Sequence, residues 1–284
     1  MRAYKLPIVG VLLMPVFFSC HKEYSYETNK QTATDTLPSN YPFANGFCDV
    51  GVSSLGVSIF DTVNFVPSDS SQLPESILLD MPVPGNQSRQ NSCTSWATVY
   101  GAANYYIHIT TGKPYSDTGN LNPQFIYNQI SKGMCGCTSF TDNLYLLKTK
   151  GACSLQAMPY NPDECDKQPD ILQKFLAKKY KIKGWAKVDL HNADLIKRAV
   201  AEKKPVLFAI NVDHGFQKIK QPYLWKKRTD PGEGHSMIIC GFDDHKSAFR
   251  VMNSWGPAWG DSGFVWIDYD FFLQNVHEGG YVVL

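Results

Sequence analysis

The order of the predicted secondary structure is the feature that most limits the fold of this chain. Helical patterns dominate up to Pro205, whereas short apolar runs of β type, separated by Gly, Asp and Asn, follow it. A helical half followed by a strand-rich half predicts an α+β protein with two lobes, and pockets tend to form between such lobes. The predicted helices cover residues 93–109, 122–130, 141–150, 169–180 and 193–203, and the predicted strands cover residues 206–210, 236–240, 248–252 and 263–267.

Residues 1–20 have the pattern of a secretory signal peptide. Arg2 and Lys5 precede an apolar run, residues 8–18, that is too short to span a bilayer comfortably. The run ends in Phe-Phe-Ser-Cys20, which resembles a bacterial lipobox, and in a lipobox the cysteine becomes the lipidated first residue of the mature protein. An ordinary signal peptide with an incidental cysteine is the alternative. We expect an exported protein held at the bacterial cell envelope by a lipid on Cys20, on the outer membrane and facing the periplasm or the surface.

Residues 21–72 are rich in Ser, Thr, Asp, Asn and Pro, and are predicted to form a polar tether and an extended N-terminal segment. The main domain is predicted to cover residues 73–284. The chain as a whole is 43% apolar and 19% charged, as globular proteins are, and its net charge of +1 argues against a nucleic-acid partner. We expect a monomer that needs neither a metal nor another cofactor.

The number of cysteines agrees with export. The chain has eight, and six remain when Cys20 and Cys93 are set aside for lipidation and catalysis, which suits an oxidising compartment with disulfides. Cys240 lies in an apolar run and is predicted to be a small buried hydrophobic residue. A zinc site built on Cys135-Gly-Cys137 is an alternative, but the C-x₂-C spacing and nearby histidines are missing. The connectivity cannot be derived from the sequence, and the preferred pairs lie among Cys135, Cys137, Cys153 and Cys165.

Three residues far apart in the sequence form a candidate site for nucleophilic catalysis. Cys93 follows a polar loop and starts a predicted helix, whose N-terminus stabilises a thiolate. His235 begins a predicted strand and Asn253 ends the next one, so neighbouring strands could place Asn253 beside His235, facing Cys93. Gln87 can offer an amide donor to an oxyanion, beside the backbone N–H of Cys93. Taken singly, each has a structural alternative: a half-cystine, a strand-end histidine and a turn asparagine.

The blocks around these residues resemble the papain family of cysteine peptidases, of the C1 type. The resemblance runs over about residues 73–284 and implies a papain-like two-lobe fold. The helical N-terminal lobe would cover about residues 87–190, the β-rich, barrel-like C-terminal lobe about residues 191–284, and the active-site cleft would lie between them. The blocks that carry it are Leu73-Pro-Glu-Ser76, Asn86-Gln87, Ser92-Cys93, Trp96-Ala97, Lys204-Pro205-Val206, Gly234-His235 and Asn253-Ser-Trp-Gly-Pro-Ala-Trp-Gly-Asp-Ser-Gly-Phe264.

The resemblance also implies a role for each matching residue. Cys93 would be the nucleophile, His235 the base and acid, Asn253 the residue that orients His235, and Gln87 the oxyanion donor. Trp255 would shield the bond between His235 and Asn253 from water, and Trp259 would line the leaving-group side. The implied activity is hydrolysis of peptide bonds in a peptide or protein substrate through a thioester acyl-enzyme.

The chain departs from the family pattern on the substrate side. Thr94 and Ser95 separate the nucleophile from Trp96, and Gln90 replaces the cysteine usually found three residues before the nucleophile. The family's Cys-x-Gly-Gly segment reads Cys137-Thr-Ser-Phe140, which puts the usual contacts to the substrate backbone in doubt. Two other functions therefore stay open: a catalytically weak binding module with the same fold, and an acyl transferase with the same triad.

Overall fold

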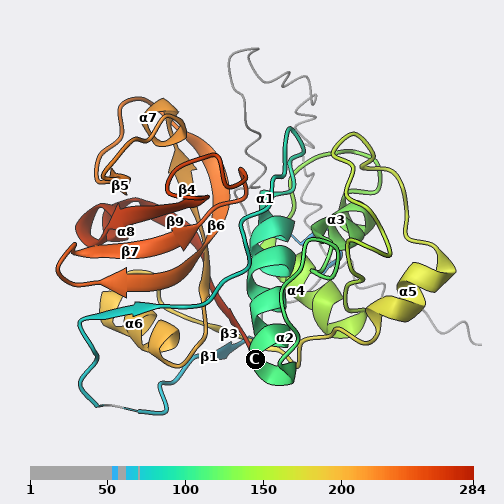
Figure 1. The fold of residues 1–284 in the computed structure, drawn as a ribbon, viewed down its shortest axis with the longest axis horizontal. Helices are drawn as coiled ribbons and strands as arrows, with labels where there is room; N and C mark the ends of the chain where they lie inside the picture. The colour runs from blue at the N-terminus through green and yellow to red at the C-terminus, as the bar shows by residue number, and fades with distance from the viewer. Residues whose placement is uncertain (1–52, 57–61, 70) are drawn as a thin grey trace, which may run out of the picture. The chain divides into compact units, whose positions relative to one another are not determined.

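A mixed β-sheet and a group of helices packed beside it make up the part of the chain that the structure describes (Figure 1). This computed structural model describes residues 53–56, 62–69 and 71–284, and all of these described residues belong to one compact unit. The predictions for residues 1–20, including the lipid on Cys20, lie outside the described residues. No helix within the described ranges has the length and apolarity needed to cross a bilayer.

One long helical run begins at the candidate nucleophile. It consists of α1 (Cys93–Ser95), the π-helical segment η2 (Trp96–Ala103) and α2 (Asn104–Thr111) in direct succession. Figure 1 shows this run between the sheet and the other helices. Gly112 ends it in the left-handed conformation with φ of 70°, which glycine adopts without steric cost. The helix predicted for residues 93–109 is thus confirmed, with a π-helical middle that the sequence pattern did not reveal.

Side-chain caps explain where three further helices begin. The Asn122 side chain accepts a hydrogen bond from the backbone N–H of Gln124, with Pro123 at the first helical position. Ser139 caps its helix in the same way, and Asp170 forms a capping box with Gln173. All three helices were predicted, within a few residues at each end. They are α3 (Pro123–Ser131), α4 (Phe140–Thr149) and α5 (Ile171–Ala177).

Nine strands of the described residues form one sheet, in the order β1-β3-β9-β4-β6-β7-β8-β5, with β2 paired to β6. All four predicted strands are present, as β4, β6, β7 and β8. The strands are β1 (Val63–Asn64), β2 (Ser76–Leu78), β3 (Trp185–Lys187), β4 (Val206–Val212), β5 (Leu224–Trp225), β6 (Glu233–Asp243), β7 (Ala248–Met252), β8 (Phe264–Asp268) and β9 (Val276–Val283), and the remaining helices are α6 (Ala193–Ala201), α7 (His214–Gln217) and α8 (Tyr269–Asn275).

The sheet lies between two hydrophobic clusters and belongs to both. In β4, Leu207 and Ala209 join the cluster formed with the helices, whereas Phe208 and Ile210 join the cluster on the other side. The neighbouring strand β6 alternates in the same way, because successive side chains of a strand point to opposite faces. This arrangement confirms the predicted α+β class, in which helices and strands are segregated along the chain.

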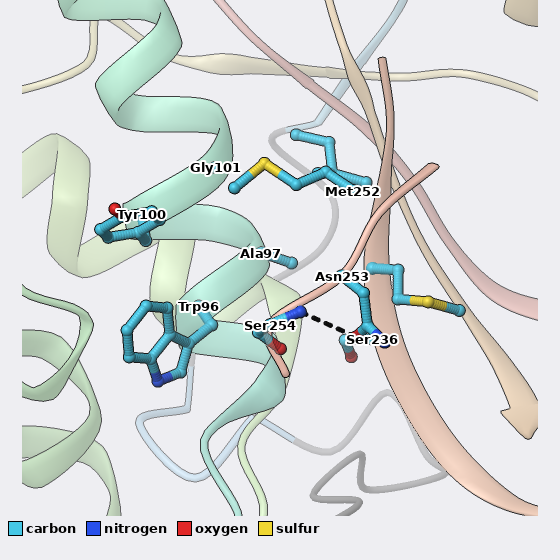
Figure 2. A pocket seen from close by; sticks show the side chains of 10 residues that line it. Trp96, Ala97, Tyr100, Gly101, Ser236, Met252, Asn253 and Ser254 are labelled. Carbon is cyan, nitrogen blue, oxygen red and sulfur yellow. Dashed lines mark hydrogen bonds between the residues drawn. The ribbon is translucent and has the colours of Figure 1, made fainter. Parts of the chain in front are cut away.

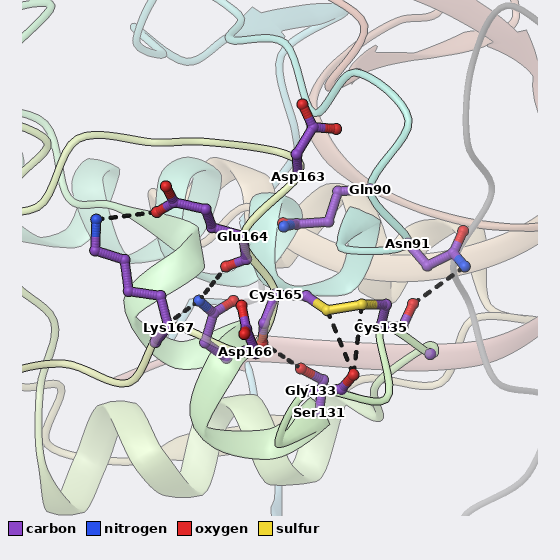
Figure 3. Close-up of a disulfide and its surroundings, with 12 residues drawn as sticks. Gln90, Asn91, Ser131, Gly133, Cys135, Asp163, Glu164, Cys165, Asp166 and Lys167 are labelled. Atoms are coloured by element: carbon purple, nitrogen blue, oxygen red, sulfur yellow. Dashed lines mark hydrogen bonds and ion pairs between the residues drawn. A yellow bond between two sulfur atoms is a disulfide. The ribbon is translucent and has the colours of Figure 1, made fainter.

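The cysteines follow the predictions only in part. Cys135 and Cys165 form a disulfide with a Cα–Cα distance of 5.4 Å (Figure 3), and Cys137 is also disulfide-bonded. Cys135 is therefore not available to zinc. The inclusion of Cys153 among the paired cysteines was wrong, because this residue is fully buried in the helical cluster as a reduced thiol. Cys240 is a buried hydrophobic residue, as predicted, and burial raises the pKa of each of these two thiols to about 12.

Candidate active site

The structure places the candidate nucleophile against strand β6. Cys93 is buried at the first position of α1, and its Sγ accepts a hydrogen bond from the backbone N–H of Ser236 over 3.4 Å. The hydroxyls of Thr94 and Ser236 lie 2.9 Å apart, so a second contact joins the same two elements. Because Ser236 directly follows His235, these contacts hold the start of the helix next to the candidate base.

The candidate base and its orienting residue come from adjacent strands, as predicted. His235 lies on β6, Asn253 directly follows β7, and a distance of 2.7 Å separates Nε2 of His235 from Oδ1 of Asn253. The same Asn253 atom accepts a hydrogen bond of 2.7 Å from the backbone N–H of Ser254. Since an N–H can only donate, this atom is the carbonyl oxygen of the amide. His235 must then donate from Nε2. In the neutral ring, Nδ1 is left as the acceptor.

The loop after Asn253 keeps this geometry. The backbone N–H of Asn253 donates to the carbonyl of Gly263 over 3.0 Å, which closes the loop at its far end. Gly263 has φ of 88°, and a Cβ added there would lie 2.4 Å from the Cβ of Pro84. Only glycine therefore fits where this loop crosses the chain before the nucleophile.

Burial determines how His235 can hold a proton. Its Nδ1 is buried and has no hydrogen-bond partner among the described residues. Burial lowers the pKa of His235 to about 4, while the hydrogen bond with Asn253 acts in the opposite direction. An isolated imidazolium is therefore disfavoured here. A proton transferred from the Cys93 thiol leaves the pair with no net charge, so an imidazolium is favoured only together with the thiolate.

Gln87 is tied to the residue after Asn253. Its Oε1 accepts from the hydroxyl of Ser254 over 2.6 Å, and its backbone N–H donates to the Ser254 carbonyl over 2.8 Å. Its Nε2 donates to the carbonyl of Gln90 over 3.0 Å, within the turn that leads to Cys93. The predicted oxyanion donor is thus buried and fixed beside the start of α1. Its role stays a prediction.

Comparison with known proteins identifies the family. The model of the papain family cysteine proteases matches residues 84–275, more than half of the chain. The chain belongs to this family. The matched region contains Gln87, Cys93, His235 and Asn253, and it lies within residues 73–284, over which the sequence blocks resemble the family, without reaching the block at Leu73.

Two known relatives share about a quarter of their aligned residues with this chain. Mouse cathepsin K is 25% identical over 213 residues, which cover 70% of this chain and 61% of the relative. Gamete and mating-type specific protein A of Dictyostelium discoideum is 26% identical over 184 residues, covering 63% of this chain and 39% of the relative. The chain thus spans less than two thirds of the length of these relatives.

Solved structures confirm the papain-like fold. Xylellain, a cysteine protease from Xylella fastidiosa, superposes with a TM-score of 0.70 and 22% identity, over 86% of this chain and 97% of that protein. A cysteine protease from Carica candamarcensis, solved in complex with E-64, superposes with a TM-score of 0.59 and 20% identity, over 74% and 98%.

Trp255 covers the histidine of this papain-family site. Its ring stacks on His235 with centroids 4.7 Å apart and an interplanar angle of 27°, and only 2% of its surface is exposed. The stack places Trp255 against the ring that bonds to Asn253, and its shielding role stays a prediction. Trp259 packs edge-on against Trp255 at 5.2 Å and donates from Nε1 to the carbonyl of Gln217 over 3.0 Å. With 6% exposed, Trp259 offers a substrate little surface, and its substrate-side role stays a prediction.

Hydrogen bonds hold the loop where the family has a cysteine. The Nε2 of Gln90 donates to the carbonyl of Pro162 over 3.3 Å, and Oε1 of Gln90 accepts from the hydroxyl of Tyr160 over 3.1 Å. The Tyr160 hydroxyl also lies 2.8 Å from the Gln87 carbonyl. Asn91 donates to the Cys135 carbonyl over 3.3 Å, beside the disulfide (Figure 3).

Sequence reasoning missed Tyr160, Ser236 and Ser254. The two serines each follow a predicted catalytic residue directly, and this adjacency was a usable signal. Tyr160 offered none, because its partners precede it by about 70 residues.

A small pocket lies where the helix meets the strands beside Asn253 (Figure 2). Its wall is mainly apolar, and Tyr100 and Trp96 line it from the helical side. It is part of the junction between the two hydrophobic clusters. The full set of lining residues is Trp96, Ala97, Tyr100, Gly101, Ser236, Met237, Ile238, Met252, Asn253 and Ser254.

Proposed function

We propose that this chain is a cysteine peptidase that hydrolyses peptide bonds through a thioester acyl-enzyme. The observation that carries the proposal is the state of His235. Its Nε2–H donates to Asn253, so only the buried Nδ1 can accept or release a proton. His235 lies on the strand whose next residue contacts the Cys93 sulfur.

The residues then supply each step of the reaction. Nδ1 of His235 takes the thiol proton, and the Cys93 sulfur attacks the carbonyl carbon of the substrate. The imidazolium gives the proton to the departing amine as the C–N bond breaks. Water, deprotonated by the same nitrogen, hydrolyses the thioester, releases the acid and restores the Cys93 thiol with the proton held by His235.

The oxyanion of the tetrahedral intermediate needs fixed donors. The backbone N–H of Cys93 belongs to the first turn of a helix, where donors point away from the helix, and Gln87 is anchored beside it by Ser254 and Gln90. Such donors need no reorganisation during the reaction, so they stabilise the developing charge.

We further propose that the mature protein is exported and anchored to the bacterial envelope by a lipid on Cys20. The lipobox-like sequence and the polar segment after it support this location. The disulfide between Cys135 and Cys165 fits an oxidising compartment.

The experiment uses residues 21–284, which contain the whole compact unit, in a buffer with a mild reductant. Hydrolysis of a mixed peptide library between pH 5 and pH 8 is followed by mass spectrometry, beside Cys93→Ala as a folded control. We expect cleavage that depends on Cys93. Intact peptides with both proteins would contradict the proposal, and amide products formed with added amines would identify an acyl transferase instead.

A further inference from the structure

Helix α5 exposes a cluster of large apolar side chains. The exposed fractions are 88% for Ile171, 64% for Leu172, 66% for Phe175 and 40% for Leu176. The other exposed large apolar residues of the described chain are spread over separate segments. A contiguous cluster of exposed apolar side chains such as this one marks a surface for interaction.

The cluster faces away from the body of the protein. With about 100° between successive residues, Gln173 and Ala177 lie on one side of α5 and the four apolar residues on the other. Ala177 is fully buried, and Gln173 donates from Nε2 to the carbonyl of Ala157 over 3.1 Å, so this side faces the protein. Figure 1 shows α5 at the edge of the helical half farthest from the sheet. The apolar side therefore contributes nothing to the described core.

The helix is formed without help from that cluster. The capping box between Asp170 and Gln173 satisfies backbone donors at its start. The carboxylate of Asp170 is engaged in this cap, where it accepts from the Gln173 backbone N–H over 2.7 Å. The apolar side chains are thus presented on a preformed turn and not on a segment that must fold on contact.

Lysines lie within and directly after α5 along the chain. Residues 171–183 contain five lysines and no acidic residue, and all five lysines are exposed. Long lysine side chains can lie along an apolar surface and keep their ammonium groups at its polar boundary. The lysines are Lys174, Lys178, Lys179, Lys181 and Lys183.

We propose that α5 and its lysines bind the surface of an anionic lipid bilayer. The apolar side chains would enter the boundary between headgroups and acyl chains, and the lysines would contact the phosphates. A second copy of the chain fits less well, because a symmetric contact through α5 would bring the two groups of lysines together. The proposal depends neither on the peptidase activity nor on the lipid expected at Cys20.

Vesicle sedimentation tests the proposal with residues 21–284, which lack Cys20 and therefore the lipid. One set of vesicles contains equal parts of phosphatidylglycerol and phosphatidylcholine, and the other contains phosphatidylcholine alone. We expect binding to the first set, weakened by high salt because screening reduces the attraction to lysines. Equal binding to both sets, or binding to neither, would refute the proposal.

Paired variants separate the two parts of the surface. We expect Leu172→Ser with Phe175→Ser to weaken vesicle binding at least tenfold, whereas Val66→Ser, which removes an even more exposed apolar side chain elsewhere, leaves it unchanged. Lys178→Glu with Lys179→Glu should also weaken binding, whereas the exposed pair Lys226→Glu with Lys227→Glu should not.

Two further measurements distinguish bilayer binding from misfolding and from self-association. All variants should keep the circular-dichroism spectrum and the melting temperature of the unchanged protein, which shows that they are folded whether or not the chain is a peptidase. A monomer-to-dimer change in sedimentation velocity that is lost with Phe175→Ser would assign the surface to a second copy and overturn the proposal.

Discussion

Replacing Asn253 with alanine removes the acceptor that the structure gives to the Nε2–H of His235. This bond is 2.7 Å long, His235 has no exposed surface, and the Trp255 ring stacks on the imidazole. A buried donor that loses its partner costs about 1–3 kcal/mol. If this cost is added in full to the activation free energy of the reaction, kcat/KM falls by about 5- to 150-fold.

The matched variant is Asn253→Asp, which keeps the size of the side chain and an acceptor oxygen. A carboxylate beside the ring would raise the pKa of His235, against the lowering by burial. We expect this variant to retain more activity than Asn253→Ala, with a pH profile displaced upwards. The alanine variant should show the opposite displacement, because it loses the bond that raises this pKa.

The assay is hydrolysis of one peptide substrate, with kcat and KM measured separately from pH 4 to pH 9. Thermal unfolding of the variants shows whether the fold is retained. If Asn253→Ala folds normally and keeps kcat/KM within twofold of the unchanged protein, the orienting role of Asn253 is refuted. Equal activity of both variants would refute the importance of the acceptor.

Three further predictions concern stability and loop geometry. In Cys93→Ala, His235 has no thiolate to pair with, so its lowered pKa acts on stability alone. The unfolded chain binds the proton more readily, and the free energy of unfolding should therefore fall by on the order of 3 kcal/mol as the pH drops from about 6.5 to about 4. Denaturant titration at several pH values measures this change, and a flat profile would contradict it. Tyr160→Phe removes a hydroxyl that holds the loop before the nucleophile, so kcat should fall by about fivefold with little change in KM, and a change in KM alone would contradict a positioning role. Cys165→Ser opens the disulfide to Cys135, which spans a sequence separation of 30, and should lower stability by about 4 kcal/mol; an unchanged melting temperature would show that this link does not constrain the unfolded chain.

Local signals made much of the fold predictable. The helix starting at Pro123 was found because an asparagine cap and a proline at the first position act within a few residues. Strand β9 was missed because Gly279 and Gly280, with φ of 107° and 73°, interrupt the alternation that identifies a strand. Its place in the sheet is set by pairing with β3 and β4, which single-sequence patterns do not contain.

The candidate site shows the same limit. His235 and Asn253 were placed together correctly, because one begins a predicted strand and the other ends the next one. The support from Tyr160 could not be derived, because it comes from a distant loop with no pattern of its own. Cys153 was assigned to a disulfide by counting, whereas the side chains that surround it in the core determine its state.

Because the side chains of β6 alternate between the two clusters, a segment exchanged with a relative within this strand must keep the same number of residues. His235 lies on the face shared with Met237 and Ile239, and Ser236, which contacts the nucleophile, lies on the face shared with Ile238. A chimera joined within β6 that gains or loses one residue would exchange these two faces. His235 would then leave its place against Trp255, and Ser236 would leave its place against Cys93, so the hybrid would have no working site.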